Sequence, residues 1–435
     1  MPDSKAKHLL LACSAFLPLT PAPAQTGEVL PVIAIPPLPT PRNMNTEAGD
    51  TRVIGIQAAE LIASDLRSSD AFMVIPRERL KQYSPTEAGA PLYQNWTSTG
   101  AGTLVTGYVQ RREDGRITLA CYLYDLKQRR EMARRGFNVQ PSQWRHAAHS
   151  CADAFYKRIT GSPGHFDTSI AYVAESGSRM SPVKRIAMVE WDGTGHRYLT
   201  QGETTVLSPR FSPDGQRLAY VSFSRGSPHI RILDIESGED RALLRPGTMS
   251  FAPIFSPDGQ RIAFSMAVNG NSDIYQVELD GAFPQQLTTT PGVDTAPSYS
   301  PDGRSIVFES DRSGTSQLYV MDANGSGQRR VSFGGGAYAS PAWSPSGDKI
   351  AFSKTRAGRT AIGVMNSNGS EERMVTDGWQ DESPGWAPGG RFLSFQRTAQ
   401  TGIAQVYTVS LAGGAPKPVA TPQPASDPAW SGASE

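Results

Sequence analysis

The sequence has few charged residues, few cysteines and no long apolar run beyond its first residues. Charged side chains make up 19% of the 435 residues and the formal net charge is +1, so composition does not indicate a nucleic-acid-binding protein. Three cysteines are too few for a disulfide-rich scaffold. No later apolar run is long enough to cross a bilayer.

Glycine and proline are abundant instead. The chain contains 42 Gly and 34 Pro, a composition that suits a turn-rich β protein better than a helical one. Disorder would require more charge and fewer aromatic residues. These proportions favour folded, largely β structure.

The first 24 residues have the pattern of a secretory signal. Lys5 and Lys7 precede the apolar stretch Leu9–Leu19, and Ala22-Pro23-Ala24 forms a cleavage pattern of small residues. We expect cleavage after Ala24 and export as a soluble protein. Leu10-Leu11-Ala12-Cys13 loosely resembles a lipoprotein processing site, which is the alternative reading.

Two cysteines remain after cleavage, Cys121 and Cys151. An even number in an oxidising compartment is compatible with one disulfide. Two buried free thiols are the alternative, because sequence alone does not give the distance between their Cα atoms.

A repeat of 43 or 44 residues fills the C-terminal part. Ser212-Pro213-Asp214-Gly215 returns at Ser256–Gly259 and Ser300–Gly303, and in altered form at Ser344–Gly347 and Ala387–Gly390. Each unit contains four short β patterns joined by Asp-Gly turns. Four strands in about 40 residues is the size of one propeller blade.

Counting the strands of each type predicts six blades. The chain enters the ring on a second-type strand at Ile170–Ala174 and leaves on a first-type strand at Asp427–Ser431. Pairing of these two segments would close the ring and remove its exposed edges. We therefore predict a six-bladed all-β propeller over residues 165–435.

Residues 25–164 show no repeat and predict a small α/β domain. Expected helices are Val53–Leu66 and Ser142–Ile159, the second capped by Ser142 and ended by Gly161. The expected strands are Glu28–Leu38, Ala71–Ile75, Thr103–Arg111, Arg116–Asp125 and Glu131–Val139.

Catalytic motifs for a serine nucleophile, a phosphate loop, a dinucleotide fold or a zinc peptidase do not occur. His146 and His149 lie three residues apart on the predicted last helix, but no acidic partner is near them in the sequence, so we expect a helix face and no metal. Asp214, Asp258 and Asp302 are explained by turn geometry better than by calcium. No cofactor is expected.

Loops at one mouth of the ring are the predicted binding surface. They combine apolar and aromatic side chains with carboxylates, a mixture that suits a protein interface. The candidate residues are Met249, Phe251, Ala252, Asp294, Thr295, Tyr338, Asp381 and Glu382.

The chain resembles the TolB family, periplasmic propellers of the Tol–Pal envelope system of Gram-negative bacteria. The resemblance rests on the signal, on Ile54–Leu66, on the SPDG repeats within Ala252–Phe264 and Thr295–Phe308, and on Asp311–Gln328. It implies a non-enzymatic scaffold that supports outer-membrane integrity and constriction at division. It also implies that the mouth binds the lipoprotein Pal.

Aligned on the SPDG turns, the family's Pal contacts fall at Met249, Ala252 and Thr295. Met249 stands where some members have histidine, so a hydrogen bond would be lost there. The resemblance also implies that TolA binds the extreme N-terminus, here Gln25, Thr26, Gly27 and Glu28. This segment is shorter than is usual in the family.

Two other functions remain open from the residues. One is the propeller gate of a serine peptidase related to prolyl oligopeptidase, although the chain has no α/β-hydrolase segment. The other is a propeller that binds sugars or cell-wall fragments.

Overall fold

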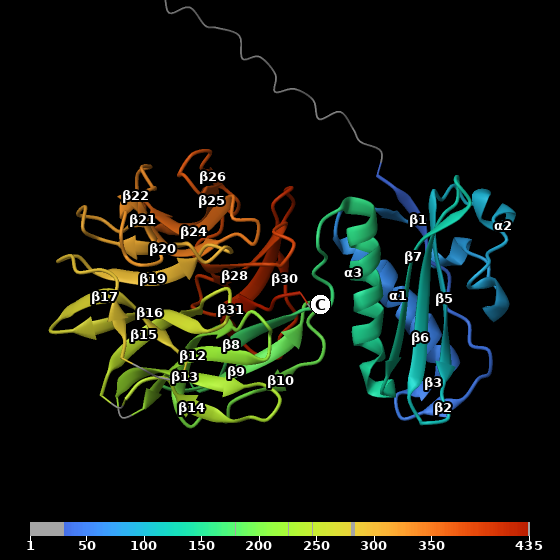
Figure 1. The fold of residues 1–435 in the computed structure, drawn as a ribbon, viewed down its shortest axis with the longest axis horizontal. Coiled ribbons are helices and arrows are strands. Elements are labelled where there is room, and N and C mark those ends of the chain that lie inside the picture. The colour runs from blue at the N-terminus through green and yellow to red at the C-terminus, as the bar shows by residue number, and fades with distance from the viewer. Residues whose placement is uncertain (1–29, 179, 225, 246, 280–282, 434–435) are drawn as a thin grey trace, which may run out of the picture.

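Two structural units follow one another along the chain in this computed structural model, an α/β domain and a β-propeller (Figure 1). The structure describes residues 30–433, except 179, 225, 246 and 280–282. The predicted signal segment and Gln25–Glu28 lie outside the described residues. The predicted fold class, an α/β domain followed by six four-stranded blades, is confirmed.

The first domain is built on a mixed five-stranded sheet in the order β4-β1-β5-β6-β7. β1 pairs in parallel with β4 and β5, and the remaining pairs are antiparallel. All the strands predicted here form, although the first two are shorter than predicted. Their bounds are β1 (Val32–Ala34), β4 (Met73–Val74), β5 (Thr103–Arg111), β6 (Ile117–Asp125) and β7 (Arg130–Val139).

Two long helices cover one face of this sheet, α1 (Thr51–Ser68) and α3 (Trp144–Thr160). The carboxylate of Asp50 accepts hydrogen bonds from two backbone N–H groups of the first turn of α1, which caps that helix. Gly161 ends α3 in the left-handed conformation, as predicted.

The predicted cap of α3 by Ser142 is wrong. Ser142 lies inside a short 3-10 turn, η3 (Pro141–Gln143), and the cap position falls on Gln143, whose side chain makes no capping hydrogen bond. Pro141 accounts for the difference, because its fixed φ favours starting a turn one residue before the serine.

The opposite face of the sheet is covered by an irregular segment. Trp96, only 2% exposed, anchors this segment against Leu104 and Tyr124. The central strands β5 and β6 are therefore largely buried on both sides, whereas the edge strand β7 stays largely exposed. The remaining short elements of the domain are β2 (Asn45–Thr46), β3 (Gly49–Asp50), η1 (Arg77–Arg79), η2 (Pro85–Glu87) and α2 (Gln94–Thr97).

A disulfide joins Cys121 in β6 to Cys151 in α3, which settles the choice left open by the sequence. Both residues are fully buried in the core between sheet and helices. The bond ties the last helix to the centre of the sheet.

Six four-stranded antiparallel blades form the propeller, coloured green to red in Figure 1. The first blade contains β8 (Ser169–Ser178), β9 (Ser181–Glu190), β10 (Arg197–Tyr198) and β31 (Ala425–Trp430). The second contains β11 (Thr205–Phe211), β12 (Arg217–Ser224), β13 (Ser227–Asp234) and β14 (Asp240–Ala242). The third contains β15 (Met249–Phe255), β16 (Arg261–Val268), β17 (Asn271–Glu278) and β18 (Gln285–Gln286).

The last three blades follow the same pattern. The fourth contains β19 (Asp294–Tyr299), β20 (Ser305–Ser310), β21 (Gln317–Asp322) and β22 (Arg329–Arg330). The fifth contains β23 (Ala337–Trp343), β24 (Lys349–Arg356), β25 (Arg359–Asn366) and β26 (Arg373–Met374). The sixth contains β27 (Asp381–Trp386), β28 (Phe392–Thr398), β29 (Ala404–Ser410) and β30 (Lys417–Pro418).

The ring closes as the strand count predicted. β31, from the end of the chain, pairs antiparallel with β8, so the first blade is assembled from both ends of the propeller. Closure leaves no unpaired inner strand on that blade.

Each innermost strand bends at the same place. One residue with φ between 49° and 55° precedes a proline in all six, and the strand register shifts there. These six residues are Ser208, Ala252, Ala296, Ser340, Ser383 and Asp427. All but Asp427, together with all but the first of the following prolines, line a central cavity of about 330 Å³. The six bulges therefore shape the channel of the propeller.

The SPDG segments form the turns between first and second strands. In the first copy, Ser212 Oγ donates to Asp214 and accepts from the backbone N–H of Arg217, while Gly215 has φ 69°. The same bonds recur from Ser256 and Ser300. The aspartates are thus used inside their own turns, as the sequence predicted.

Candidate functional site

The propeller has two ends with different connections. Because the strands of each blade are antiparallel, the links from fourth strand to next first strand share one end with the second-to-third hairpins. The SPDG turns lie at the other end. We call the first end the mouth.

Exposed apolar side chains gather at the mouth. Of ten large hydrophobic side chains that are exposed in the described part of the propeller, seven lie at this end, five in the connections and two at strand ends. Phe333, at 72% exposure, and Trp379, at 46%, are the largest. The others are Met180, Met249, Val268, Val293 and Ile403. Such a concentration at one end is typical of a surface that contacts another macromolecule.

The predicted partner-binding residues divide by exposure. Met249 is exposed, and Phe251, Ala252, Thr295 and Glu382 are partly buried. Thr295 Oγ1 is 3.0 Å from the hydroxyl of Ser265. Ala252 faces the central cavity. These five remain the predicted contacts whose side chains reach the surface or the cavity.

Asp294, Tyr338 and Asp381 are fully buried. They hold the mouth loops from inside, so a partner would touch the exposed apolar neighbours and not these three side chains. Sequence patterns did not distinguish these three buried residues from the five accessible ones. Their burial depends on a cationic side chain from the same blade, which is distant in the sequence.

Blades four and six bury the aspartate in the same way. Asp294 accepts from Arg312 at 2.8 Å, and that guanidinium lies over the rings of Phe308 and Tyr319. Asp381 accepts two hydrogen bonds from Arg397, at 2.7 and 2.8 Å. Bidentate pairs of this kind fix geometry as well as charge.

Blade five uses a tyrosine in place of the aspartate. The Tyr338 hydroxyl donates to Glu372 at 2.7 Å, and Lys354 Nζ lies 2.5 Å from the same carboxylate and 4.6 Å from the tyrosine ring centre. Three consecutive blades thus carry a cation that is paired with a carboxylate beneath the mouth loops.

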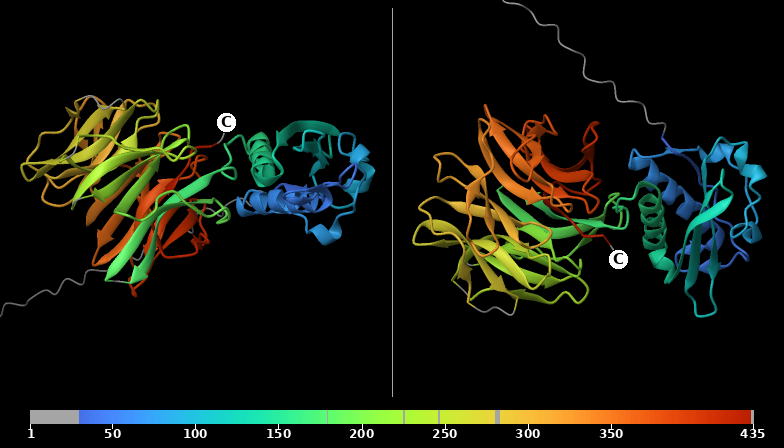
Figure 2. Two further views of the ribbon diagram at one scale, coloured as in Figure 1. Left: turned by 90° about the horizontal axis from the view of Figure 1, so that it is seen from below. Right: turned by 45° about the horizontal axis from the view of Figure 1, so that its top comes forward.

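A second polar cluster lies where the two domains meet. Figures 1 and 2 show α3 on the side of the first domain that faces the propeller. From α3, Arg145 donates to Glu190, the last residue of β9, at 2.9 Å and to Asp192, in the connection between β9 and β10, at 2.6 Å. Further along, Arg391 of the sixth blade donates to the Tyr156 hydroxyl at 2.8 Å.

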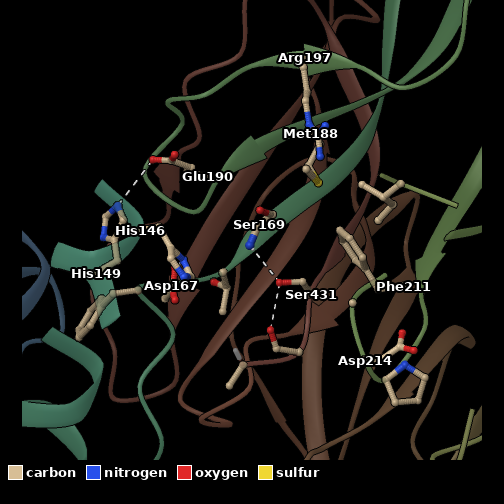
Figure 3. A pocket seen from close by; sticks show the side chains of 17 residues that line it. His146, His149, Asp167, Ser169, Met188, Glu190, Arg197, Phe211, Asp214 and Ser431 are labelled. Atoms are coloured by element: carbon tan, nitrogen blue, oxygen red, sulfur yellow. Dashed lines mark hydrogen bonds and ion pairs between the residues drawn. The ribbon is translucent and has the colours of Figure 1, made fainter. Parts of the chain in front are cut away.

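His149 is buried in the same cluster. Its Nδ1 lies 2.7 Å from Asp65 in α1, and its Nε2 points toward Glu190, as Figure 3 shows. Burial disfavours charge on His149, but the hydrogen bond with Asp65 and the nearby carboxylate of Glu190 outweigh it and raise the pKa to about 10. Burial also opposes charge on Glu190. Its hydrogen bonds outweigh that effect and lower the pKa of this carboxyl to about 2.

The expectation that no acidic partner lies near His149 is wrong. Asp65 is 84 residues away in the sequence, and Glu190 comes from the other domain. No local spacing signals such a cluster, so only the docking of the two domains reveals it. His146, the other helix histidine, instead lies 2.6 Å from Asp167 and is half exposed.

An open pocket of about 310 Å³ lies beside this cluster, between α3 and the first two blades (Figure 3). Its lining includes His146, Asp167, Arg197 and Ser431.

Within residues 30–433, as far as they are described, no helix is long and apolar enough to cross a membrane.

The fold and the mouth define a six-bladed β-propeller carrying an N-terminal α/β domain. Family models agree with this architecture over both units. The model described as "TolB beta propeller domain" matches residues 156–434, and that described as "TolB amino-terminal domain" matches residues 29–132. The first match covers more than half of the sequence, so the chain belongs to the TolB family.

Individual relatives carry the same name. A protein named "Tol-Pal system protein TolB" from Rhizorhabdus wittichii is 51% identical over 192 residues, 44% of this chain and 44% of the relative. One of the same name from Zymomonas mobilis is 48% identical over 212 residues, 49% of this chain and 46% of the relative. The chain thus spans about half the length of the curated relatives it matches.

A solved structure extends the similarity to both domains. The crystal structure of TolB from Acinetobacter baumannii has a TM-score of 0.79 and 27% identity, covering 93% of this chain and 97% of that one. The arrangement of both domains is therefore shared with a solved TolB.

Proposed function

We propose that this protein is a non-enzymatic periplasmic scaffold of the Tol–Pal system whose propeller mouth binds the lipoprotein Pal. Membership of the TolB family and relatives named for the Tol–Pal system support this proposal. In this role it would support outer-membrane integrity and constriction at cell division.

The observation that carries the proposal is the gathering of exposed apolar side chains at one end of the ring. Aromatic anchors such as Trp379 and Phe333 are the side chains that contribute most at protein interfaces. Arg312 and Arg397 pair with buried carboxylates beneath the mouth loops, and loops held in this way reduce the ordering cost of binding.

The disulfide is consistent with export of the protein from the cytoplasm. A bond between Cys121 and Cys151 forms and persists in an oxidising compartment such as the periplasm. The signal of residues 1–24 would direct the protein there, with cleavage after Ala24. Mass spectrometry of the mature protein should find Gln25 as the first residue, and any other start would move the proposed boundary.

The test of Pal binding compares two exposed phenylalanines. Phe333 lies at the mouth and Phe283, 88% exposed, lies in a third-to-fourth-strand connection at the opposite end. We expect Phe333→Ala and Thr295→Arg to weaken capture of purified Pal at least about tenfold, since interface anchors are commonly worth 2 kcal/mol or more. Phe283→Ala is the matched control and should capture Pal normally. Undiminished capture of Pal by both mouth variants would rule out the mouth as the Pal-binding surface.

TolA binding is proposed for the N-terminal segment Gln25, Thr26, Gly27 and Glu28, on the basis of the family resemblance. Deleting these four residues should reduce TolA capture and leave Pal capture unchanged. Loss of both interactions would show that the segment does not act as a separate site.

A fluorophosphonate probe, which reacts with serine peptidases, should leave the protein unlabelled. Labelling would favour the peptidase alternative instead.

A further inference from the structure

The imidazole of His149 has an atom that the described structure does not use. Its side chain is 2% exposed, and Nε2 has no hydrogen-bond partner. The nearest charged atoms are Glu190 Oε2 at 3.6 Å and Asp192 Oδ2 at 4.0 Å. A buried ring nitrogen that lies within ion-pair distance of two carboxylates, but too far for a hydrogen bond with either, requires an explanation.

These distances suit ligands of a common ion better than hydrogen-bonded neighbours. A hydrogen bond would bring the atoms to about 2.9 Å. Ligands held at 2.0–2.1 Å around a tetrahedral Zn²⁺ are separated by about 3.3 Å. The three atoms all lie within 4.8 Å of one another, so zinc binding would draw them together, and no pair would have to close by more than about 1.5 Å.

The other side of the ring has the arrangement typical of a metal ligand. His149 Nδ1 is hydrogen bonded to Asp65, which is itself 1% exposed and held within α1. Metal-binding histidines nearly always donate their second N–H to a carboxylate or carbonyl, which fixes the ring and makes it a better ligand. Asp65 would therefore be a positioning residue, not a ligand.

We propose that His149 Nε2, Glu190 Oε2 and Asp192 Oδ2 form a Zn²⁺ site that joins the two domains. One imidazole with two carboxylates is a donor set that zinc accepts, whereas magnesium and calcium prefer oxygen ligands alone. Because His149 belongs to α3 and both carboxylates belong to the first blade, the ion would hold the two domains together. The site shares no residue with the proposed Pal-binding mouth, so it does not depend on the proposed function.

Arg145 is the cation that now occupies these carboxylates, and it must move for zinc to bind. Its side chain is 27% exposed and its guanidinium already lies 5.5 Å from the ring of Trp144, so it can leave toward solvent. Arg145 therefore competes with the metal.

The test is titration of the full mature chain with Zn²⁺, followed by calorimetry and by the melting temperature. We expect saturable binding of one ion and a higher melting temperature, with no effect from Mg²⁺. His149→Gln should abolish binding. Asp65→Asn should weaken it about 10–100-fold, as loss of a supporting carboxylate does. Arg145→Gln should bind zinc more tightly than the unmodified protein.

The matched control is His146→Gln on the same helix. His146 is half exposed and pairs with Asp167, so its loss should leave zinc affinity unchanged. If His149→Gln fails to fold, Glu190→Gln and Asp192→Asn replace ligands that are 32% and 20% exposed, and each should weaken binding at least about tenfold. Absence of zinc binding, binding retained in these variants, or binding lost with His146 would overturn the proposal.

Discussion

Trp430, in the last strand of the chain, donates a hydrogen bond from its indole Nε1 to Thr168 Oγ1 at 2.8 Å, across 262 residues of sequence. Thr168 directly precedes β8, the strand with which β31 pairs. The indole is only 8% exposed and packs in the core shared by the first and last blades. This contact fixes the closure of the ring.

Removal of β31 should therefore destabilise the propeller strongly. Truncation after Gln423 deletes the strand and with it the buried side chain of Trp430, whose loss alone is worth roughly 3–5 kcal/mol. We expect the melting temperature to fall by about 10 °C or more. Truncation after Ser431 keeps the strand and should melt like the full chain. Equal melting of the two truncations would contradict closure by β31.

The disulfide should contribute measurably to stability. Cys121 and Cys151 are separated by 30 residues, and closing a loop of that size restricts the unfolded chain by roughly 3–4 kcal/mol. The double variant Cys121→Ala, Cys151→Ala should unfold at lower denaturant concentration. Reducing the bond in the unfolded wild-type protein, and then refolding the protein in reductant, should lower the denaturation midpoint by the same amount. An unchanged midpoint in both would show that the bond does not stabilise the domain.

His165 should make the protein sensitive to acid. Burial, with the charge of Arg391, lowers the pKa of its imidazole to about 3. The unfolded chain takes up a proton near pH 6.5 and the folded chain does not, so stability falls as pH drops from about 6.5 to about 3, by roughly 1.4 kcal/mol per unit.

The variant His165→Phe isolates this effect. The ring would pack among Phe166, Trp191, Phe392 and Trp430, as the imidazole does. Its free energy of unfolding, measured in denaturant at several pH values, should exceed that of the wild type by an amount that grows below pH 6.5. A constant difference across this range would show that His165 does not titrate as inferred.

The buried pair at the mouth should be costly to break. Asp381 is fully buried and Arg397 is 25% exposed, so Asp381→Asn leaves the guanidinium largely without its partner and should cost roughly 2–4 kcal/mol. Glu382→Gln, at the neighbouring and more exposed position, is the control and should change stability by less than about 0.5 kcal/mol. Chemical denaturation distinguishes the two, and equal losses would remove the structural role given to Asp381.

The repeating turns determined the propeller from sequence alone. Each Ser-Pro-Asp-Gly segment forms its turn through bonds within a few residues, as between Ser212 and Arg217, so local chemistry was enough to count blades and to predict the pairing of β31 with β8. The capping of α3 was missed, because Pro141 shifted the start of the turn by one residue.

Tertiary structure alone decided which side chains face a partner and which are buried. The sequence predicts Asp294 and Met249 equally as surface contacts. In the structure Asp294 is buried in an ion pair with Arg312, whereas Met249 is exposed. The cluster at His149 likewise brings together residues from α1, α3 and the first blade. Burial and charge pairing between distant segments depend on how whole domains pack, and short-range sequence patterns do not contain that information.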